Sequence, residues 1–366
     1  MEKSNSRLLS LDIFRGLTII FMIIVNDPGS WSHVYAPLLH ANWNGLTPTD
    51  YIFPSFIFIV GISIVLSLTK QTDKGITKEQ LVKKILLRSL KIYLVGLFLW
   101  LWPSFDFGRI RWVGVLHRIA LVFMVCALLF LYTKRKTQLI IAAVVLVLYW
   151  LVMMYLPVPG IGIPDLSEPG KNWANYLDQN YLPGYLWEET WDPEGILSSF
   201  PAVVTGLLGM MAGFILISKT ELKDKLNQLF LLAASLLIMG DIAQYFFPIN
   251  KGIWSSSFVL MAGGISCLLL ACFVYCIDIK EQYSKFKFAR VFGVNAIFAY
   301  SLAGIFYTIF YSEKLWGVSL SVTYMEQIIA IGIPPKLGSL LYALFYVFVI
   351  WIPTYMLFKR KIYIKL

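Results

Sequence analysis

The sequence predicts an all-α polytopic membrane protein of about ten transmembrane helices, with both termini in the cytoplasm. Hydrophobic residues make up 58% of its 366 residues and charged residues only 14%, a balance that soluble globular domains do not show. Apolar stretches of about 20 residues, long enough to cross a bilayer as a helix, recur along the whole chain. Lys and Arg gather between alternate stretches, which is the asymmetry that marks cytoplasmic segments.

The apolar stretches define the order of the predicted spans. No small-residue cleavage site follows the first apolar run, so we expect the first span to be retained. We expect one transmembrane domain over residues 1–366, in the inner (cytoplasmic) membrane and without a soluble domain at either end. The predicted spans cover residues 13–30, 51–69, 85–102, 112–132, 138–156, 196–217, 227–247, 254–277, 289–311 and 338–357.

The net charge of +10 has two explanations, a topology signal or an anionic partner. Most of the 31 Lys and Arg residues fall in segments that the alternating spans place in the cytoplasm, so topology explains the excess. We therefore expect the lipid bilayer to be the partner, and no nucleic acid. All four cysteines lie inside apolar spans and form no CxxC pair, which indicates neither a disulfide framework nor a metal site.

The polar loop between the first two spans is the first candidate site. An apolar run ends at Asn26, and two of the three histidines, His33 and His40, follow in a loop without Lys or Arg. The sequence Thr47-Pro48-Thr49-Asp50 predicts a helix start with Thr47 as N-cap and with Asp50 bonding back to it. Polar groups near lipid are costly unless they are paired or functional.

Further polar residues lie at the predicted outer side. His117 and Arg118 fall several residues inside span 112–132, and an intramembrane His-Arg pair is a candidate functional site; the alternative is that Arg118 is structural and bonds to carbonyls of a neighbouring helix. Asp241 lies near the outer end of span 227–247. Residues 157–195 form one long outer loop in which acidic and aromatic residues are interleaved. Such a loop suits a cationic sugar that stacks on the rings, and an interfacial aromatic belt is the alternative explanation.

The chemistry of these residues leaves two functions open. A histidine without metal-ligand spacing is a candidate general base or nucleophile, and His40 is the candidate here. Asn26 or Asn44 can donate a hydrogen bond to a developing oxyanion. From the residues alone, group transfer and proton-coupled transport are equally supported. The transport alternative is a secondary transporter of sugars or acidic solutes that uses His117, Arg118 and Asp241.

Six segments in order carry a resemblance to one enzyme family. They read RLLSLDIFRGLTIIFMIIVN, HANWNGLTPTDYIFPSFIFIVGISI, GVLHRIAL, WDPEGILSSFPAVVTGLLG, INKGIWSSSFVL and FGVNAIFAY. Together they span nearly the whole chain, and the sequence resembles the family of heparan-α-glucosaminide N-acetyltransferase. Two departures are visible: the family usually has Gln where this chain has His117, and the loop between Asn26 and His40 is longer than in the animal enzyme.

The resemblance implies a membrane acyltransferase that moves an acetyl group from acetyl-CoA to the amine of a terminal glucosamine-type sugar at the outer side. The family's catalytic histidine falls on His40 and its supporting asparagine on Asn26, and we add Asp50 as a third catalytic candidate. Whether His40 is a base or an acetyl carrier is left open. The candidate substrate-binding residues are Trp43, Asn44, His117, Arg118, Asp192, Glu194 and Asp241.

Acetyl-CoA is the expected co-substrate, and no metal is expected. CoA is made in the cytosol, so its phosphates should meet cations near the inner boundary, where Arg15, Lys84 and Arg88 are the candidates. The positive-inside rule explains the same residues without a ligand. A homodimer is the default expectation for the assembly.

Overall fold

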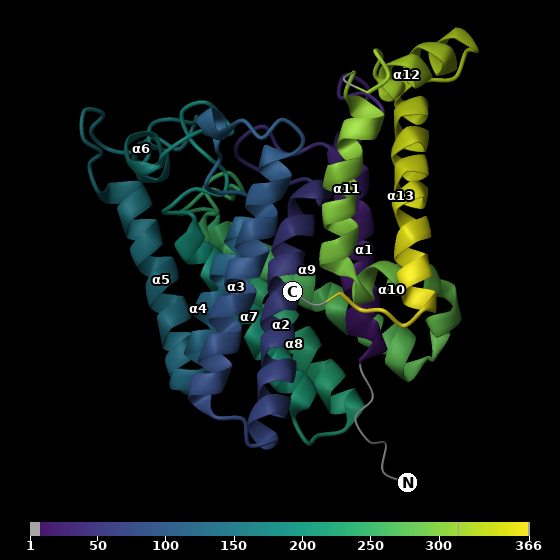
Figure 1. The fold of residues 1–366 in the computed structure, drawn as a ribbon. Coiled ribbons are helices and arrows are strands. Elements are labelled where there is room, and N and C mark those ends of the chain that lie inside the picture. The colour runs from purple at the N-terminus through teal and green to yellow at the C-terminus, as the bar shows by residue number, and fades with distance from the viewer. Residues whose placement is uncertain (1–7, 314, 365–366) are drawn as a thin grey trace. The chain divides into compact units, whose positions relative to one another are not determined.

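The computed structural model describes residues 8–313 and 315–364, and the named secondary-structure elements of this part of the chain are all helices (Figure 1). Backbone pairing outside helices is limited there to two isolated bridges, Arg111 with Gly184 and Val158 with Gly162. The all-α prediction is confirmed. The chain divides into two compact units: unit 1 comprises Met1–His40, Thr47–Ile52 and Leu269–Leu366, and unit 2 comprises Ala41–Leu46 and Phe53–Leu268.

Unit 1 is built around α1, which packs against α10 at glycines on both helices. A Cβ at Gly16 would overlap the backbone of Ala289, and one at Gly293 would overlap the carbonyl of Asp12. Only small residues let two helix backbones approach this closely. The unit holds α1 (Leu9–Asn26), η1 (Ala36–Leu38), η2 (Pro48–Tyr51), η4 (Val274–Ile279), η5 (Gln282–Phe286), α10 (Lys287–Val294), α11 (Ala296–Tyr311), α12 (Leu320–Ala330) and α13 (Pro335–Lys359).

Unit 2 is organised around α7, the most buried of its membrane-length helices. A Cβ at Gly209 would overlap the backbone of Phe58, and one at Gly61 would overlap the carbonyl of Gly206, so glycines again allow close helix contact. The helices are α2 (Ile52–Asp73), α3 (Lys78–Leu101), η3 (Phe107–Arg109), α4 (Val115–Tyr132), α5 (Arg135–Tyr155), α6 (Trp173–Tyr181), α7 (Ser199–Ile217), α8 (Leu222–Ala243) and α9 (Ser256–Phe273), whose last residues belong to unit 1.

The membrane-length helices agree with most of the predicted spans. Within the described residues, eight helices are long and apolar enough to cross a membrane, or nine if one bent pair counts as a span. Helix α3 covers the predicted span 85–102 but carries Lys84, Arg88 and Lys91 along its apolar length. The chain is therefore a multi-pass helical protein, as its apolar stretches predict.

The predicted span 289–311 was wrong as one continuous helix. The chain breaks at Asn295, and the helical segments on its two sides are bent by 74°. The side chain of Asn295 explains the break because its Nδ2 donates to the carbonyl of Ile362, at 3.1 Å, and its Oδ1 accepts from the backbone N–H of Ile364, at 2.9 Å. An asparagine that bonds to backbone outside its helix favours a helix end.

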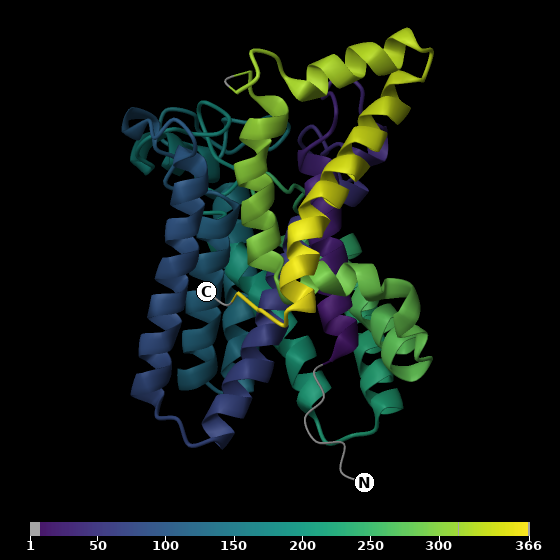
Figure 2. The same cartoon turned by 45° about the vertical axis from the view of Figure 1, so that its right-hand side comes forward.

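The long segment 157–195 is folded over one end of unit 2. It contains α6, whose N-cap Asn172 accepts a hydrogen bond from the backbone N–H of Asn175. Leu166 and Ala174 pack in a buried cluster with Tyr149 and Met153 of α5 and with Phe247 and Ile253, which lie between α8 and α9. Both views place α6 beside the same end of α5 (Figures 1 and 2). The segment is therefore an ordered cap on unit 2.

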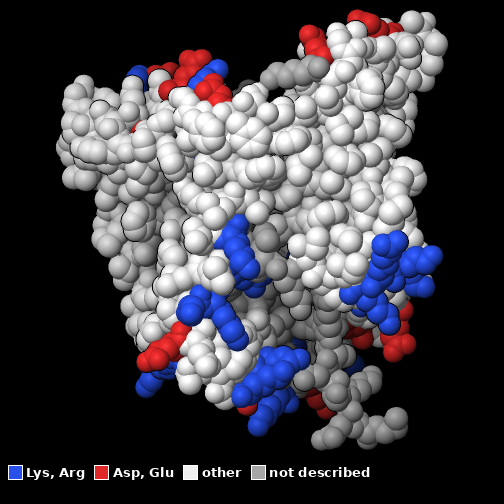
Figure 3. Space-filling view, in the orientation of Figure 1, with Lys and Arg blue, Asp and Glu red and all other residues white. Residues whose placement is uncertain are grey.

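Charged side chains separate along unit 2 on the face drawn in Figure 3. Most Lys and Arg side chains of this face lie in its lower half, below a largely uncharged band, and its upper edge carries mainly Asp and Glu with a few cations. The separation agrees with the charge asymmetry from which the topology is predicted.

Candidate functional site

His40 and Asp50 form a hydrogen-bonded pair in unit 1. The Nδ1 atom of His40 lies 2.7 Å from Oδ1 of Asp50, and Asp50 is 1% exposed whereas the His40 side chain is 48% exposed. A carboxylate only accepts hydrogen bonds, so Nδ1 of a neutral His40 carries the proton and the basic lone pair lies on Nε2. The pair thus has the tautomer that a general base or a nucleophile needs.

The predicted helix start holds the carboxylate of Asp50 in place. Helix η2 begins after the N-cap Thr47, and the backbone N–H of Thr47 donates to Oδ2 of Asp50 at 2.9 Å, which confirms the expected back-bond. The hydroxyl of Thr47 donates to the carbonyl of Leu39 at 2.6 Å, beside His40. One Asp50 oxygen therefore fixes the backbone, and the other fixes the imidazole.

Asn26, the second predicted catalytic residue, is the last residue of α1 and is exposed. Among the described residues it makes no direct hydrogen bond to the His40–Asp50 pair. The next residue, Asp27, is buried, and its carbonyl accepts a hydrogen bond from the hydroxyl of Tyr311 at 2.6 Å. The loop beyond it is tied to α13, where Ser339 accepts from the backbone N–H groups of Gly29 and Ser30.

Trp43 and Asn44 anchor their loop to the rest of unit 2. Both side chains donate to the carbonyl of Leu166, each at 2.8 Å. Oδ1 of Asn44 accepts from Nδ2 of Asn250 at 3.0 Å, and the Trp43 ring packs edge-on against Trp191 at 5.3 Å between centroids. The predicted substrate role of these residues stays a prediction, and the structure adds an anchoring role.

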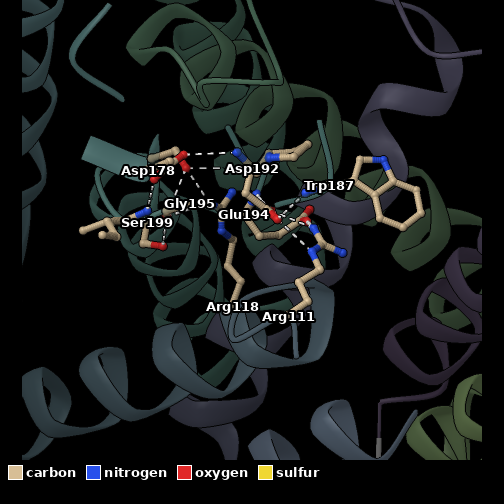
Figure 4. A network of polar contacts seen from close by, with 11 residues as sticks. Arg111, Arg118, Asp178, Trp187, Asp192, Glu194, Gly195 and Ser199 are labelled. Carbon is tan, nitrogen blue, oxygen red and sulfur yellow. Dashed lines mark hydrogen bonds and ion pairs between the residues drawn. The ribbon is translucent and has the colours of Figure 1, made fainter. Parts of the chain in front are cut away.

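A buried ion-pair cluster links the start of α4 to the acidic end of the 157–195 segment (Figure 4). Nε and Nη2 of Arg111 donate to the two oxygens of Asp192, both at 2.7 Å, and Nη2 also donates to Glu194 at 2.7 Å. Burial lowers the pKa of Arg111, but its bonds and attraction to the two carboxylates outweigh this and raise it. Asp192 and Glu194 are thus already paired with a cation.

Sequence reasoning missed Arg111. Arg111 lies with Arg109 in the short loop between two predicted spans, and the neighbouring outer loop 157–195 holds far more acidic than basic residues. That local charge imbalance was the available signal, because two buried carboxylates need a cationic partner. The guanidinium of Arg111 also lies 5.0 Å from the Trp187 ring.

Asp178 of α6 holds the backbone of the same cluster. Its two oxygens accept from the backbone N–H of Asp192 at 3.3 Å and of Ile196 at 2.8 Å. Burial raises the pKa of Asp178 to about 6, although these bonds oppose the rise. A Cβ at Gly195 would overlap this carboxylate, so only glycine fits there (Figure 4).

His117 and Arg118 lie beside this cluster, at the start of α4, and both are buried. Nη2 of Arg118 donates to the hydroxyl of Ser198 at 2.5 Å and to the carbonyl of Gly195 at 3.3 Å. The guanidinium carbon lies 4.9 Å from the Trp254 ring. Nε and Nη1 of Arg118 and Nε2 of His117 have no hydrogen-bond partner in the described part of the chain.

Asp241, the remaining predicted substrate residue, is exposed on α8 and accepts a hydrogen bond from Gln244 at 2.5 Å. The structure shows no contact between Asp241 and the Arg111 cluster among the described residues. The transport alternative needs Asp241 to act together with His117 and Arg118, and the geometry gives no support for this.

The three predicted CoA-binding cations have different surroundings. Arg15 pairs with Asp12 at 3.6 Å and donates to the carbonyl of Gly293 at 3.2 Å, which ties α1 to α10. Arg88 lies 4.8 Å from the Phe123 ring, and Lys84 is exposed on α3. Their role toward CoA stays a prediction.

A comparison with known protein families identifies the family of this chain. Residues 7–251, which include His40, Asp50 and the Arg111 cluster, match the family model described as heparan-alpha-glucosaminide N-acetyltransferase, catalytic. The chain belongs to this family.

Two relatives are named after the same enzyme. The chain is 28% identical to heparan-alpha-glucosaminide N-acetyltransferase of Homo sapiens, over 98% of this chain and 60% of the human protein. It is also 28% identical to the Mus musculus protein of that name, over 100% of this chain and 61% of the mouse protein. This heparan-alpha-glucosaminide N-acetyltransferase family member therefore spans about 60% of the length of the curated relatives it matches.

Proposed function

We propose that this membrane protein transfers an acetyl group from acetyl-CoA to the amine of a terminal glucosamine-type sugar, with His40 as the general base or the acetyl carrier. The observation that carries the proposal is the pair of His40 with buried Asp50, 2.7 Å apart, inside the region that matches an acetyltransferase family. The names of the human and mouse relatives support the reaction class and the sugar.

His40 has two balanced routes to the product. As a base, Nε2 takes a proton from the acceptor amine while the amine nitrogen attacks the thioester carbonyl; the C–S bond then breaks, and the thiolate of CoA receives a proton. As a carrier, Nε2 attacks the carbonyl and CoA leaves as a thiolate; the amine nitrogen then attacks the acetyl-imidazolium, the bond from the acetyl carbon to Nε2 breaks, and the proton that the amine loses passes to the thiolate. In both routes Asp50 stabilises positive charge on the ring and holds its orientation.

Asn26 is proposed to assist at the carbonyl. A side-chain amide can donate a hydrogen bond to the negative oxygen that forms when a thioester is attacked. Asn26 suits this role because it is exposed at the end of α1, in the same unit as His40. A thioester is already activated, so the protein needs only to position the amine, accept its proton and stabilise the oxyanion.

We also propose that the cation-rich ends of the helices face the cytoplasm and that the protein lies in the inner membrane. Acetyl-CoA would then reach the protein from the cytosol and the sugar from the other side. The charge asymmetry along unit 2 supports this orientation (Figure 3). Protease digestion of a tag fused to the C-terminus tests it: in sealed spheroplasts the tag should be protected, and cleavage there would contradict the orientation.

The decisive experiment uses purified protein and acetyl-CoA labelled on its acetyl group, with and without glucosamine. Wild type should place label on the sugar, and His40→Ala should not. The matched control is His33→Ala, because His33 lies in the same loop and bonds only to Ser30, at 3.3 Å, within the described residues; it should retain activity. Equal transfer by His40→Ala would refute the role of His40. A wild type that neither transfers acetyl nor binds acetyl-CoA would refute the function.

A further inference from the structure

A cavity of about 380 Å³ lies between α3 and α4 in unit 2. Its lip is formed by apolar side chains that are well exposed: Leu90 is 53% exposed, Leu86 47% and Leu121 37%. Leu121 lies on α4, which is long and apolar enough to cross a membrane, and Leu86 and Leu90 lie on α3, which covers the predicted span 85–102. In a bilayer they face lipid tails, so the cavity opens toward the hydrocarbon region.

The inner wall of this cavity carries polar atoms without partners. Nε and Nη1 of Arg118, Oγ of Ser89 and Nε2 of His117 are buried and make no hydrogen bond in the part of the chain that the structure describes. All three residues line the cavity, and they are 2%, 6% and 6% exposed, respectively. A buried polar group without a hydrogen-bond partner is destabilising, so several of them around one cavity indicate a ligand that bonds to them.

The cavity continues along α3 as an apolar groove. A second hollow of about 550 Å³ shares Leu86 and Leu90 with the first and reaches Glu79 and Lys83. From Glu79 to Tyr93 the helix rises about 21 Å at about 1.5 Å per residue. Half of a hydrocarbon core is about 15 Å thick, so the groove accommodates the full length of a lipid tail.

The charges around the polar wall favour an uncharged headgroup. Two guanidinium groups, those of Arg111 and Arg118, lie among three carboxylates, those of Asp178, Asp192 and Glu194. At the far end of the groove, Lys83 and Glu79 carry opposite charges. An anionic phosphate would gain no net attraction from this set, whereas a neutral oxygen accepts hydrogen bonds from the free N–H groups of Arg118 without electrostatic penalty.

We infer that the α3–α4 groove binds a lipid whose uncharged, hydroxyl- or carbonyl-bearing headgroup accepts hydrogen bonds from Arg118 and Ser89, with its hydrocarbon tail along α3. Sugar hydroxyls and ester carbonyls both have this chemistry. The inference concerns binding alone and stands or falls independently of acetyl transfer by His40.

Native mass spectrometry of the full chain in detergent tests it, with a monoglucosyl diacylglycerol as the uncharged probe and a phosphatidylglycerol of the same chain lengths as the anionic probe. Leu90→Trp places a large ring on the lip of the groove. The matched control is Leu94→Trp, because Leu94 is 50% exposed on the same helix but does not line the cavity. Ser89→Ala removes one polar group from the wall without changing the helix.

Wild type should bind the glucosyl lipid at least about tenfold more tightly than the phosphatidylglycerol, which corresponds to about 1.4 kcal/mol. Leu90→Trp should weaken binding by a similar factor, Ser89→Ala should reduce the preference for the sugar headgroup, and Leu94→Trp should bind as wild type does. Equal binding by both Trp variants would overturn the site, and tighter binding of phosphatidylglycerol would overturn the headgroup chemistry. Displacement of the lipid by acetyl-CoA would assign the groove to the CoA substrate instead.

Discussion

Nδ1 of the half-exposed His40 ring lies 2.7 Å from a carboxylate oxygen of Asp50, a residue that is almost completely buried. The second oxygen of Asp50 accepts from the backbone N–H of Thr47. The backbone at the start of η2 thus fixes the carboxylate, and the carboxylate fixes the ring. Asp50 therefore acts on the proposed reaction through the His40 ring, by fixing its orientation and its tautomer.

Asp50→Asn should lower the turnover number of the proposed acetyl transfer by about 10²–10⁴-fold. An amide nitrogen in place of the carboxylate oxygen can donate to Nδ1, which leaves the proton on Nε2, so the ring cannot act as base or nucleophile. Steady-state kinetics with acetyl-CoA and glucosamine check this, with KM for acetyl-CoA expected to change little. Full turnover by a folded Asp50→Asn protein would show that the pair is structural.

Arg111→Met should be among the most destabilising single changes in unit 2, at about 3–5 kcal/mol, because it leaves the carboxylates of Asp192 and Glu194 buried without a cation. Arg111→Lys should recover only part of this loss, since an ammonium cannot make the paired bonds to Asp192. Thermal unfolding in detergent measures both. The control is Arg109→Met, because Arg109 is exposed on the same segment; an equal loss there would contradict the prediction.

Gly195→Ala should destabilise the 157–195 segment by about 1–3 kcal/mol, the usual cost of adding a methyl group to a filled site. The new methyl would overlap the carboxylate of Asp178 and break its bonds to the backbone of Asp192 and Ile196. Gly108→Ala is the control, because a Cβ there meets only one side-chain oxygen, at 3.2 Å. Limited proteolysis of the segment compares the two; equal resistance would refute the packing argument.

The sequence was sufficient to predict the helical class, most spans and the start of η2. Apolar length determines whether a helix can cross a membrane, and the Thr47–Asp50 pattern is a local signal that needs no tertiary contact. The break at Asn295 was not predictable from hydropathy, because an apolar run looks the same whether or not one amide bonds to backbone near the C-terminus. Local patterns were therefore reliable, and side-chain partners distant in sequence were not.

The candidate site shows the same limit. His40 and Asp50 are close in sequence and share one loop, so their proximity could be expected. The partner of Asp192 is Arg111, 81 residues away, and the anchoring of Trp43 and Asn44 by Leu166 spans more than 120 residues. Neither periodicity nor residue spacing indicates such contacts. In the sequence, a cation in a loop is explained by membrane topology alone, and only the folded structure shows that Arg111 pairs with buried carboxylates.

Asp178 predicts a specific dependence of stability on pH. Burial raises its pKa to about 6 in the folded protein, above the ordinary value of 3.8. The folded state therefore binds the proton of Asp178 more tightly than the unfolded state does, and this tighter binding adds to the free energy of unfolding. The addition is fully present below about pH 4, declines between about pH 4 and 6, and is lost above that. Within this range the free energy of unfolding changes by at most about 1.4 kcal/mol per pH unit because of Asp178.

Asp178→Asn isolates this contribution, because an amide does not titrate and the other carboxylates of the protein cancel in the comparison. The variant should be less stable than wild type at pH 4, since one of its two side-chain acceptors is lost, and the gap should narrow as the pH rises to 7. Thermal unfolding of both proteins across this range measures the difference. A gap that stays constant or widens with rising pH would show that burial does not hold a proton on Asp178.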